Sequence, residues 1–546
     1  MMRKKFSILF AAVMLAVCIF SCGLFAACDD GEKEYDTYPP VQKAAVQAKT
    51  LNVIDKSDVT PAEMLTLITL QGITANLTDD QIFLTSSEAP MNDTSLQYLQ
   101  DEFGVKVTVY EDVWDIFAKY KGLITGYILC NVGEPSVNVA TGFAGAKKAV
   151  AVDESLEQRM KDELELTLVK DVRQWDETIL SEAYMRQEGF SDTYAFELSY
   201  TDIGYLRDYA AMVGGLVFWV GVEDKREAVM DNLNLRPEGF VMGYGDYSIT
   251  GNENVFIQGT SEHGINYLPC NWSINLSVLS GFPTRVETVQ KSPDTVESYD
   301  AGKHYVTFLL SDGDNIQWAT NNGNDAQWWG SDARGEVPVA WTVAPTMNEL
   351  APAVQDFRYS TQSEADNFIV HDSSFMFFNY YPEEYLPMHC ARLNEYMGLL
   401  DVSSCSILGM RSFMGSTDNV WNYYMSQPNL NGILYFEWGG GGYSAWDGMI
   451  RWVNDKPIIS CAAEINTAET DLETFVEKVN TRALAEGGTD PTKAACYTLV
   501  YVNCWGVTVQ DMKDAMDQFS DNVEVVNADQ LIDLVTHHQT AKPAAA

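Results

Sequence analysis

The chain has 546 residues, of which 46% are hydrophobic and 12% aromatic, and it carries 77 Asp and Glu against 35 Lys and Arg, a formal net charge of −42. Such an excess of negative charge repels phosphate, so it argues against nucleic acid and anionic lipid surfaces as binding partners. The hydrophobic content is too high for an acidic disordered chain, and the length predicts two or three folded domains.

Residues 1–27 have the pattern of a secretory signal. Three basic residues at positions 3–5 precede an uncharged, apolar stretch. The run Leu-Phe-Ala-Ala-Cys that ends at Cys28 resembles a bacterial lipobox, in which the cysteine is lipidated, so we predict an exported protein anchored through Cys28. Cys22 is the competing lipidation site. An uncleaved membrane anchor is the alternative, because the apolar stretch is long enough to span a bilayer.

The pattern of residues 28–285 indicates a tether followed by an N-terminal domain. Residues 28–50 hold the anchor and an acidic, polar tether. Residues 51–285 alternate between strand-like and helical stretches, which predicts an α/β domain with a largely parallel sheet. The expected strands lie at 81–85, 105–110, 123–130, 149–152 and 216–221. Residues 286–300 are polar and without a strong period, as in a linker.

Residues 301–538 contain eight short runs of strand composition, with helical stretches between several of them. The runs lie at 305–310, 338–343, 374–380, 405–410, 432–437, 457–462, 496–503 and 523–526. This alternation predicts a (β/α)-barrel-like C-terminal domain, with an open doubly wound sheet as the alternative. Residues 539–546 form an alanine-rich tail.

Polar side chains follow most of these runs. In a barrel of parallel strands, the chemistry lies at the carboxyl ends, so we expect these side chains to converge on one face. In chain order they are Asp312, Asp314 and Asn315, then Asn379 and Tyr381, Arg411, Glu437 and Trp438, Glu464, and finally Asn503 and Trp505.

Three of these residues are carboxylates suited to acid/base chemistry. Glycoside hydrolysis commonly uses two carboxyl groups, one to protonate the leaving oxygen and one to act at the anomeric carbon or its water. Asp312, Asp314 and Glu437 are the candidates, although Asp-Gly-Asp-Asn is also a composition of turns and helix caps. Tryptophans close to these positions, notably Trp318, Trp329 and Trp438, offer flat apolar faces to sugar rings; the structural alternative is burial in the core.

Other chemistry has little support in the sequence. There is no Gly-x-Ser-x-Gly elbow, His-Glu-x-x-His, P-loop or dinucleotide-binding glycine fingerprint. Seven scattered cysteines follow Cys28 without a Cys-x-x-Cys pair, so neither a disulfide framework nor a zinc site is expected. We therefore expect no cofactor and no metal.

Several blocks resemble the family of predicted glycoside hydrolases named for a GxGYxYP motif. They are residues 306–318, which include Ser-Asp-Gly-Asp-Asn, and the blocks 69–73, 243–246 and 275–281. The resemblance covers nearly the whole chain after the tether. It implies an N-terminal α/β domain, a C-terminal barrel-like domain and a role in sugar processing. It also adds Asp246, in Gly-Tyr-Gly-Asp, as a further carboxylate candidate.

The chain departs from the family pattern in two places. Residues 376–382 read Met-Phe-Phe-Asn-Tyr-Tyr-Pro, so only Tyr381 and Pro382 match the naming motif, and bulky replacements are expected to reshape part of the cleft. Asn503 stands where relatives look to carry His, and Asn cannot shuttle protons.

The sequence therefore predicts an exported, lipid-anchored glycoside hydrolase whose substrate is a saccharide. Its predicted catalytic residues are Asp312, Asp314, Glu437 and Asp246. Its predicted sugar contacts are Asn315, Gln317, Trp318, Trp329, Asn379, Tyr381, Arg411, Trp438, Asn503 and Trp505. The first alternative is a noncatalytic glycan-binding lipoprotein. The second is a cation-dependent structural protein of the envelope.

Overall fold

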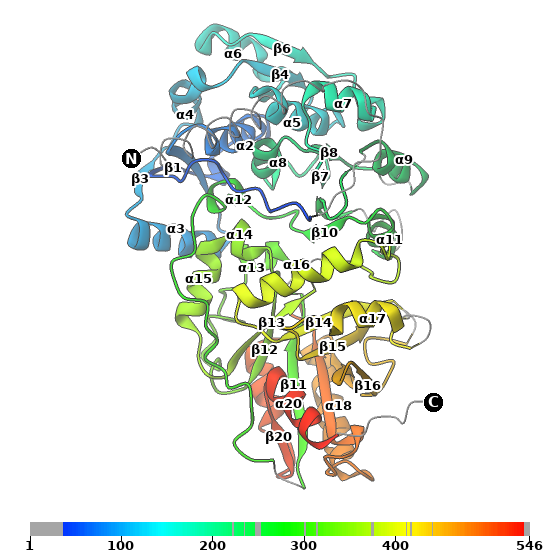
Figure 1. Cartoon of the computed structure of the whole chain (residues 1–546). Coiled ribbons are helices and arrows are strands. Elements are labelled where there is room, and N and C mark those ends of the chain that lie inside the picture. Colours follow the sequence, from blue (N-terminus) through cyan, green and yellow to red (C-terminus); the bar gives the residue numbers. More distant parts are fainter. Residues whose placement is uncertain are drawn as a thin grey trace, which may run out of the picture. The chain divides into compact units, whose positions relative to one another are not determined.

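The computed structural model describes residues 37–220, 223–233, 235–245, 253–299, 302–312, 315–372, 376–410, 412–414, 418–438 and 441–539 (Figure 1). The described residues belong to one unit of the chain that starts at Thr37. The predicted signal segment and Cys28 lie outside the described ranges. No helix within those ranges is long and apolar enough to cross a membrane.

The N-terminal half of the chain forms three small parallel sheets. The first has the order β2-β1-β3, the second β5-β4-β6 and the third β10-β9-β7-β8. The strands are β1 Thr50–Asp55, β2 Asp80–Thr85, β3 Lys106–Val109, β4 Tyr127–Cys130, β5 Val150–Asp153, β6 Leu168–Asp171, β7 Tyr194–Glu197, β8 Leu216–Phe218, β9 Phe240–Gly243 and β10 Asn266–Pro269. The main helices between them are α2 Pro61–Ala75, α3 Pro90–Phe103, α4 Val113–Tyr120, α5 Ser136–Lys147, α6 Glu157–Leu164, α7 Glu182–Glu188, α8 Arg207–Val213, α9 Glu223–Leu233, α11 Asn254–Glu262 and α12 Leu276–Leu279.

Helix α2 is the central helix of this region. Thr60 and Glu63 form a capping box at its start, and its residues from Met64 to Ala75 are all buried. Gly72 lets α2 approach α8 closely, because a Cβ at that position would lie 1.9 Å from the Asp208 carbonyl oxygen. Gly72 belongs to one of the blocks that carry the family resemblance, and close helix packing explains the glycine.

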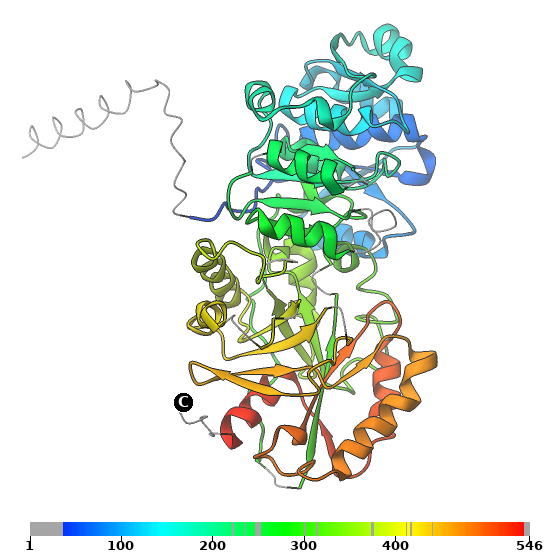
Figure 2. The same cartoon turned by 90° about the vertical axis from the view of Figure 1, so that its right-hand side faces the viewer.

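The C-terminal half of the chain is built on one curled sheet with the order β16-β17-β15-β14-β13-β12-β11-β19-β18, and β20 pairs with β11 (Figure 2). Its strands are β11 His304–Leu310, β12 Val339–Val343, β13 Asp366–His371, β14 Ser404–Gly409, β15 Gly432–Glu437, β16 Ile450–Val453, β17 Lys456–Ser460, β18 Ala463–Ile465, β19 Tyr497–Val502 and β20 Val523–Val525. All pairs are parallel except β16 with β17.

One short segment brings the two ends of the curled sheet together. β17 pairs with β15, and β18, two residues further along, pairs with β19. The amide of Cys461 donates to Tyr435 in β15, and the amide of Ala462 donates to Leu499 in β19. The sheet therefore curls back on itself, which confirms the prediction of a barrel-like C-terminal domain after an α/β N-terminal region.

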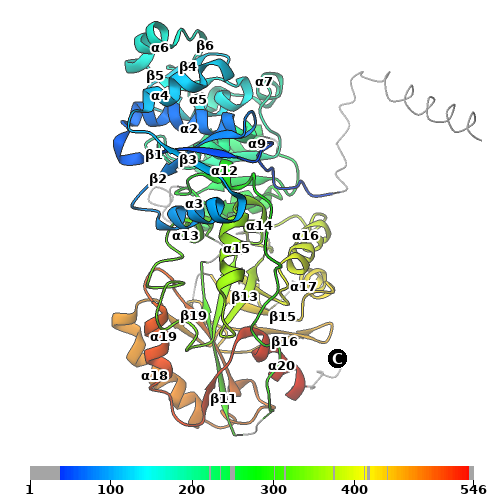
Figure 3. The ribbon, with the colours of Figure 1, turned by 90° about the vertical axis from the view of Figure 1, so that its left-hand side faces the viewer.

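Helices cover the curled sheet and contact the N-terminal half. They are α13 Ile316–Asn321, α14 Met347–Leu350, α15 Pro352–Thr361, α16 Leu386–Leu399, α17 Asp418–Met425, α18 Ala468–Leu484, α19 Val509–Met516 and α20 Ala528–His538. On the side shown in Figure 3, α13 and α15 pack against α3, and α14 packs against α12.

One expected strand is misplaced. The described part of 374–380 forms no strand, and β13 lies earlier, at Asp366–His371. The aromatic composition of 376–380 suggested a strand, but Phe377 and Phe378 are buried in the core, and Phe378 packs against Trp421. The true strand has polar residues at its start; Asn367, for example, is buried and donates to Asp529 over 2.7 Å.

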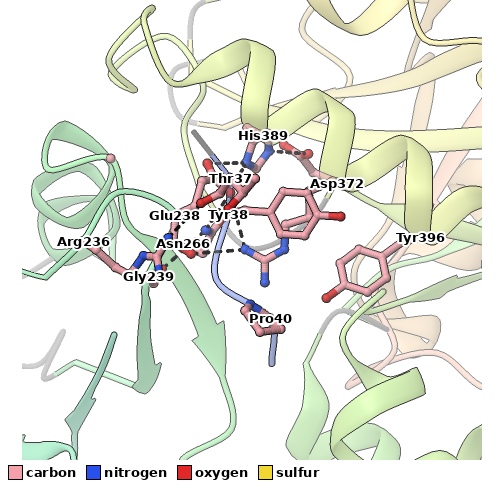
Figure 4. Close-up of polar contacts among 12 residues, drawn as sticks. Thr37, Tyr38, Pro40, Arg236, Glu238, Gly239, Asn266, Asp372, His389 and Tyr396 are labelled. Atoms are coloured by element: carbon pink, nitrogen blue, oxygen red, sulfur yellow. Dashed lines mark hydrogen bonds and ion pairs between the residues drawn. The ribbon is translucent and has the colours of Figure 1, made fainter. Parts of the chain in front are cut away.

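A buried ionic cluster joins the third N-terminal sheet to the C-terminal half (Figure 4). The ring of His389, on α16, contacts Glu238 through Nδ1 over 3.1 Å and Asp372 through Nε2 over 3.0 Å, and all three side chains are buried. Glu238 directly precedes Gly239 and β9, whereas Asp372 directly follows β13. Arg392 and the hydroxyl of Tyr381 also contact the Glu238 carboxylate.

The cluster shifts the pKa values of His389 and Glu238 in opposite directions. Burial alone would lower the pKa of His389, but the charges of Glu238 and Asp372 outweigh it and raise that pKa to about 10. Burial alone would raise the pKa of Glu238, but His389 and Arg392 outweigh it and lower that pKa to about 2. His389 is therefore an imidazolium at neutral pH, held between two carboxylates.

We expect the H389Q substitution to remove a pH-dependent part of the free energy of unfolding. The folded pKa of His389, about 10, lies above its ordinary value of 6.5, so its contribution is complete below pH 6.5 and disappears as pH rises through 10. Breaking a buried pair costs about 3–5 kcal/mol. Urea unfolding of the wild type and H389Q at pH 6, 8 and 10 measures both effects.

The matched control is H537Q, because the His537 side chain is exposed near the end of α20. That variant should change the free energy of unfolding by less than about 0.5 kcal/mol, as surface substitutions usually do. Equal loss of stability in the wild type and H389Q between pH 6 and 10 would contradict the assigned role of His389.

Candidate functional site

A cavity of about 690 Å³ lies at the carboxyl ends of the strands of the curled sheet. Its C-terminal lining comprises Leu309, Ser311, Asp312, Asn315, Gln317, Thr342, His371, Ser406, Leu408, Phe436, Trp438, Tyr443, Tyr501, Asn503 and Trp505. Tyr244, Glu253, Asn271 and Trp272 complete it from the third N-terminal sheet and its loops. The cavity therefore lies at the carboxyl ends of parallel strands, which is where barrel enzymes have their active sites.

Strand alternation decides which side chains face the cavity. Successive side chains of a strand point to opposite faces, so Ser406 and Leu408 of β14 line the cavity together, as do Tyr501 of β19 and Asn503 just beyond its end. On β15 the same rule brings Phe436 and Trp438 to the cavity.

Glu437 points to the other face of β15 and is a correction to the predicted catalytic set. It is 4% exposed and accepts hydrogen bonds from the Tyr435 hydroxyl over 2.9 Å and the Trp446 indole over 2.8 Å. Those contacts satisfy a buried carboxylate within the core, away from the cavity. The sequence correctly predicted that Glu437 ends a strand. Because successive side chains of a strand point to opposite faces, its side chain points away from the cavity.

Asp312 lies in the cavity, two residues beyond the end of β11. Its φ of 60° is in the left-handed region, which Asp tolerates better than most residues but at some cost in backbone strain. Such strain is typical of functional positions that the surrounding structure holds in place. The predicted Asp314 lies outside the described residues, whereas Asn315 lines the same cavity.

Two stacked tyrosines form the wall beside Asp312. The rings of Tyr443 and Tyr501 lie 3.8 Å apart between centroids with 13° between their planes. Burial and the negative charge of Asp312 raise the pKa of Tyr501 far above its ordinary range. Burial, Asp312 and Glu253 also raise the pKa of Tyr443. Both phenols thus stay protonated and offer hydroxyl donors near two carboxylates.

His371, at the end of β13, is a site residue that the sequence analysis missed. Its Nδ1 lies 2.9 Å from the Ser406 hydroxyl, and both residues line the cavity. The residue was overlooked because the third strand of this half was predicted eight residues too late. A polar residue at the end of the run 366–371 was the available signal.

The structure divides the predicted site residues into three groups. Asp312, Asn315, Gln317, Trp438, Asn503 and Trp505 line the cavity together. Trp318, Trp329, Asn379, Tyr381 and Glu437 are not among its lining residues. Asp246, Asp314 and Arg411 lie outside the described residues, although Tyr244, two positions before Asp246, lines the cavity.

The two displaced tryptophans are core residues. Trp318 is 1% exposed and packs edge-on against Trp328, while Trp329 is 3% exposed and stacks on Phe368. Neither ring has surface left for a sugar. The expectation that they contact substrate is therefore corrected to a packing role.

The altered motif at 376–382 also lies in the core. Met376 and Phe378 are buried, and Tyr381 donates hydrogen bonds to Glu238 and, over 2.7 Å, to the Gly264 carbonyl. None of the motif's described residues lines the cavity. Tyr381 therefore joins the two halves of the chain, and Phe377 packs behind the cavity residue Trp438, with ring centroids 6.4 Å apart. A reshaped cleft stays a prediction.

Within the described ranges, no group of three His, Cys, Asp or Glu side chains is arranged to hold a metal ion. The cavity's chemistry among described residues consists of two carboxylates, Asp312 and Glu253, one imidazole, and hydroxyl, amide and aromatic groups.

Comparison with known proteins gives a consistent set of matches. The family model described as "GxGYxYP putative glycoside hydrolase C-terminal domain" matches residues 302–536. Models for the first, second and third N-terminal domains of the same family match residues 50–122, 124–189 and 192–281, and each range contains one of the three small sheets. No curated protein matches the chain.

A solved structure is similar over nearly the whole chain. It is the crystal structure of a "putative hydrolase" from Bacteroides thetaiotaomicron, with a TM-score of 0.82 and 28% sequence identity. The alignment covers 93% of this chain and 99% of that chain.

The backbone of Asp312 yields a prediction about stability. Removing the carboxylate by D312A or by D312G has the same chemical effect, but only Gly relieves the left-handed conformation. We expect D312G to be about 0.5–1 kcal/mol more stable than D312A in urea unfolding.

Glu473 supplies the control, because it is exposed in the interior of helix α18, where the backbone has negative φ. There E473G should be less stable than E473A, since Gly loses more conformational freedom on folding. The same order of stability at both positions would contradict a strained Asp312.

Proposed function

The chain belongs to the GxGYxYP family, and on that premise we propose that it is a glycoside hydrolase acting on a glycan held in the 690 Å³ cavity. The observation that carries the proposal is the joint presence of Asp312, Glu253 and several aromatic rings in this cavity. The similar structure named as a hydrolase supports the same class of reaction.

Glycoside hydrolysis needs two carboxyl groups and a means of orienting the sugar. Asp312 and Glu253 supply the carboxyl groups, one to protonate the leaving oxygen and the other to act at the anomeric carbon or its water. The protonated hydroxyls of Tyr443 and Tyr501 donate hydrogen bonds to sugar oxygens or to the carboxylate beside them. Asp314 and Asp246 remain predicted carboxylates of the same site.

A noncatalytic glycan-binding protein is the second candidate function. The observation that favours it is the role of Asn503, whose side-chain oxygen accepts the backbone N–H of Trp505 over 2.8 Å. Asn503 therefore positions a tryptophan, where a proton-transferring His was expected in relatives. The withdrawal of Glu437 into the core removes a further acid.

The D312N variant should lose glycan hydrolysis by at least about a hundredfold while keeping its fold and its affinity for glycan, because the amide cannot transfer a proton or attack carbon. A glycan-library screen that measures bound glycan and released product together gives both quantities. E253Q is expected to behave similarly.

E437Q is the matched control, since Glu437 lies outside the cavity and Gln retains an acceptor for Tyr435 and Trp446. Its hydrolysis should stay within a few-fold of the wild type. Unchanged hydrolysis by D312N would overturn the catalytic role of Asp312, and wild-type binding without product release would favour the second candidate function.

We also propose that the protein is exported and lipid-anchored at Cys28, on the basis of the basic and apolar segment that precedes this cysteine. In a bacterial host, C28S should abolish both the incorporation of labelled palmitate and the removal of residues 1–27, because processing at a lipobox requires the lipidated cysteine. C22S should leave both unchanged, and the reverse pattern would assign lipidation to Cys22.

A further inference from the structure

Two exposed tryptophans line the cavity from different halves of the chain. All 13 tryptophans lie within the described residues, and 11 of them are buried or half-buried. The exposed pair is Trp272, which follows β10 and is 49% exposed, and Trp505, which follows β19 and is 48% exposed. Both belong to the cavity lining.

Hydrogen bonds hold the backbone of each exposed tryptophan in place. The N–H of Trp272 donates to Gln317 Oε1 over 3.1 Å, and Asn321 Nδ2 donates to the Trp272 carbonyl over 2.9 Å. Both partners lie on α13 of the C-terminal half. Gln317 was predicted to contact substrate directly. In the structure it also positions Trp272, which belongs to the N-terminal half.

Trp505 is held in an equivalent way. Its N–H donates to Asn503 Oδ1 over 2.8 Å. The next residue is packed tightly, since a Cβ on Gly506 would lie 2.1 Å from the Asn466 carbonyl oxygen. The backbone that carries each exposed indole is therefore held in place at the cavity.

A half-exposed indole in a cavity is suited to stacking on the apolar face of a sugar ring. The indole contributes a large contact area and loses little conformational freedom on binding. A cavity of about 690 Å³ falls in the range that holds a drug-sized ligand of several rings. Two such platforms in one cavity therefore fit an oligosaccharide better than a single sugar.

The charge of the cavity restricts the kind of oligosaccharide. Asp312 and Glu253 line it, whereas the described lining residues include no Lys or Arg. The chain as a whole carries a formal charge of −42. Carboxylated or sulfated sugars would be repelled by these two carboxylates, and no Lys or Arg among the described lining residues would offset that repulsion, so a neutral glycan is favoured.

We propose that Trp272 and Trp505 are two sugar-stacking platforms that bind one neutral oligosaccharide across both halves of the chain. This inference rests on the proposed glycan-binding function of the cavity, and it adds the substrate class and a recognition residue from the N-terminal half. The preferred length of the oligosaccharide would then depend on the distance between the two indoles, which is set by the contacts between Trp272 and α13.

The test uses isothermal titration of full-length D312N with neutral gluco-, manno- and xylo-oligosaccharides of two to six units and with matched uronate oligomers. Affinity for the preferred neutral series should rise with chain length. Adding W272A or W505A should weaken binding of the longest oligomer at least tenfold and binding of the disaccharide less. W272F and W505F, which keep a ring, should retain most of the affinity.

W452A is the matched control, because Trp452 lies on β16 outside the cavity lining. It should bind the longest oligomer like its parent. If the parent binds neutral oligomers but W272A and W505A bind equally well, this inference fails and the proposed function stands. Stronger binding of uronates would overturn the neutral class, and binding of no glycan by the wild type or D312N would overturn both proposals.

Discussion

The candidate site depends on the buried imidazolium of His389, held between Glu238 and Asp372. Part of the cavity wall comes from loops around β9 and β10, and the rest from strands of the curled sheet, so the cavity exists only while these two parts stay in register. Glu238 precedes β9 and Asp372 follows β13, next to the cavity residue His371. This charged ring therefore helps to fix the N-terminal wall against the end of a cavity-forming strand, together with the hydrogen bonds between Trp272 and α13.

The sequence blocks that carry the family resemblance meet one another in the folded chain. Gln71 donates to Asn275 Oδ1 over 2.7 Å, and the same oxygen accepts the amide of Leu84 over 2.8 Å. Tyr381, from the naming motif, bonds to Glu238 of the ionic cluster. These blocks therefore describe how the parts of the chain are joined, whereas the cavity's own chemistry lies largely in the block that contains Asp312.

Composition and periodicity were sufficient to predict the fold class and most strands of the C-terminal half, but they missed several strands of the N-terminal half, such as β7 and β9. They predicted Asp312, Trp438 and Asn503 in the cavity because the carboxyl ends of parallel strands meet at one edge. They could not predict the face on which Glu437 lies, since that depends on register, nor the burial of Trp329, since apolar rings suit both a core and a sugar.

Contacts between residues distant in sequence were beyond such reasoning. Trp272 and Glu253 reach the cavity through tertiary packing of the N-terminal half, and neither position is marked by a local pattern. The error over β13 has the same origin, because the aromatic run at 376–380 packs as core under tertiary constraint while a strand forms from the more polar segment before it.

The pairing of β11 has a consequence for how the chain folds. β11 is the first strand of the curled sheet in chain order, yet it pairs with β19 and with β20, whose partner residues lie 192 and 219 positions later in the chain. Until those last strands have been synthesised, the long apolar edge of β11 is an open template for pairing with another chain. Asp312 lies two residues beyond the end of that strand and beside Tyr501 of β19, so the candidate catalytic carboxylate acquires its final environment only after β19 has paired with β11.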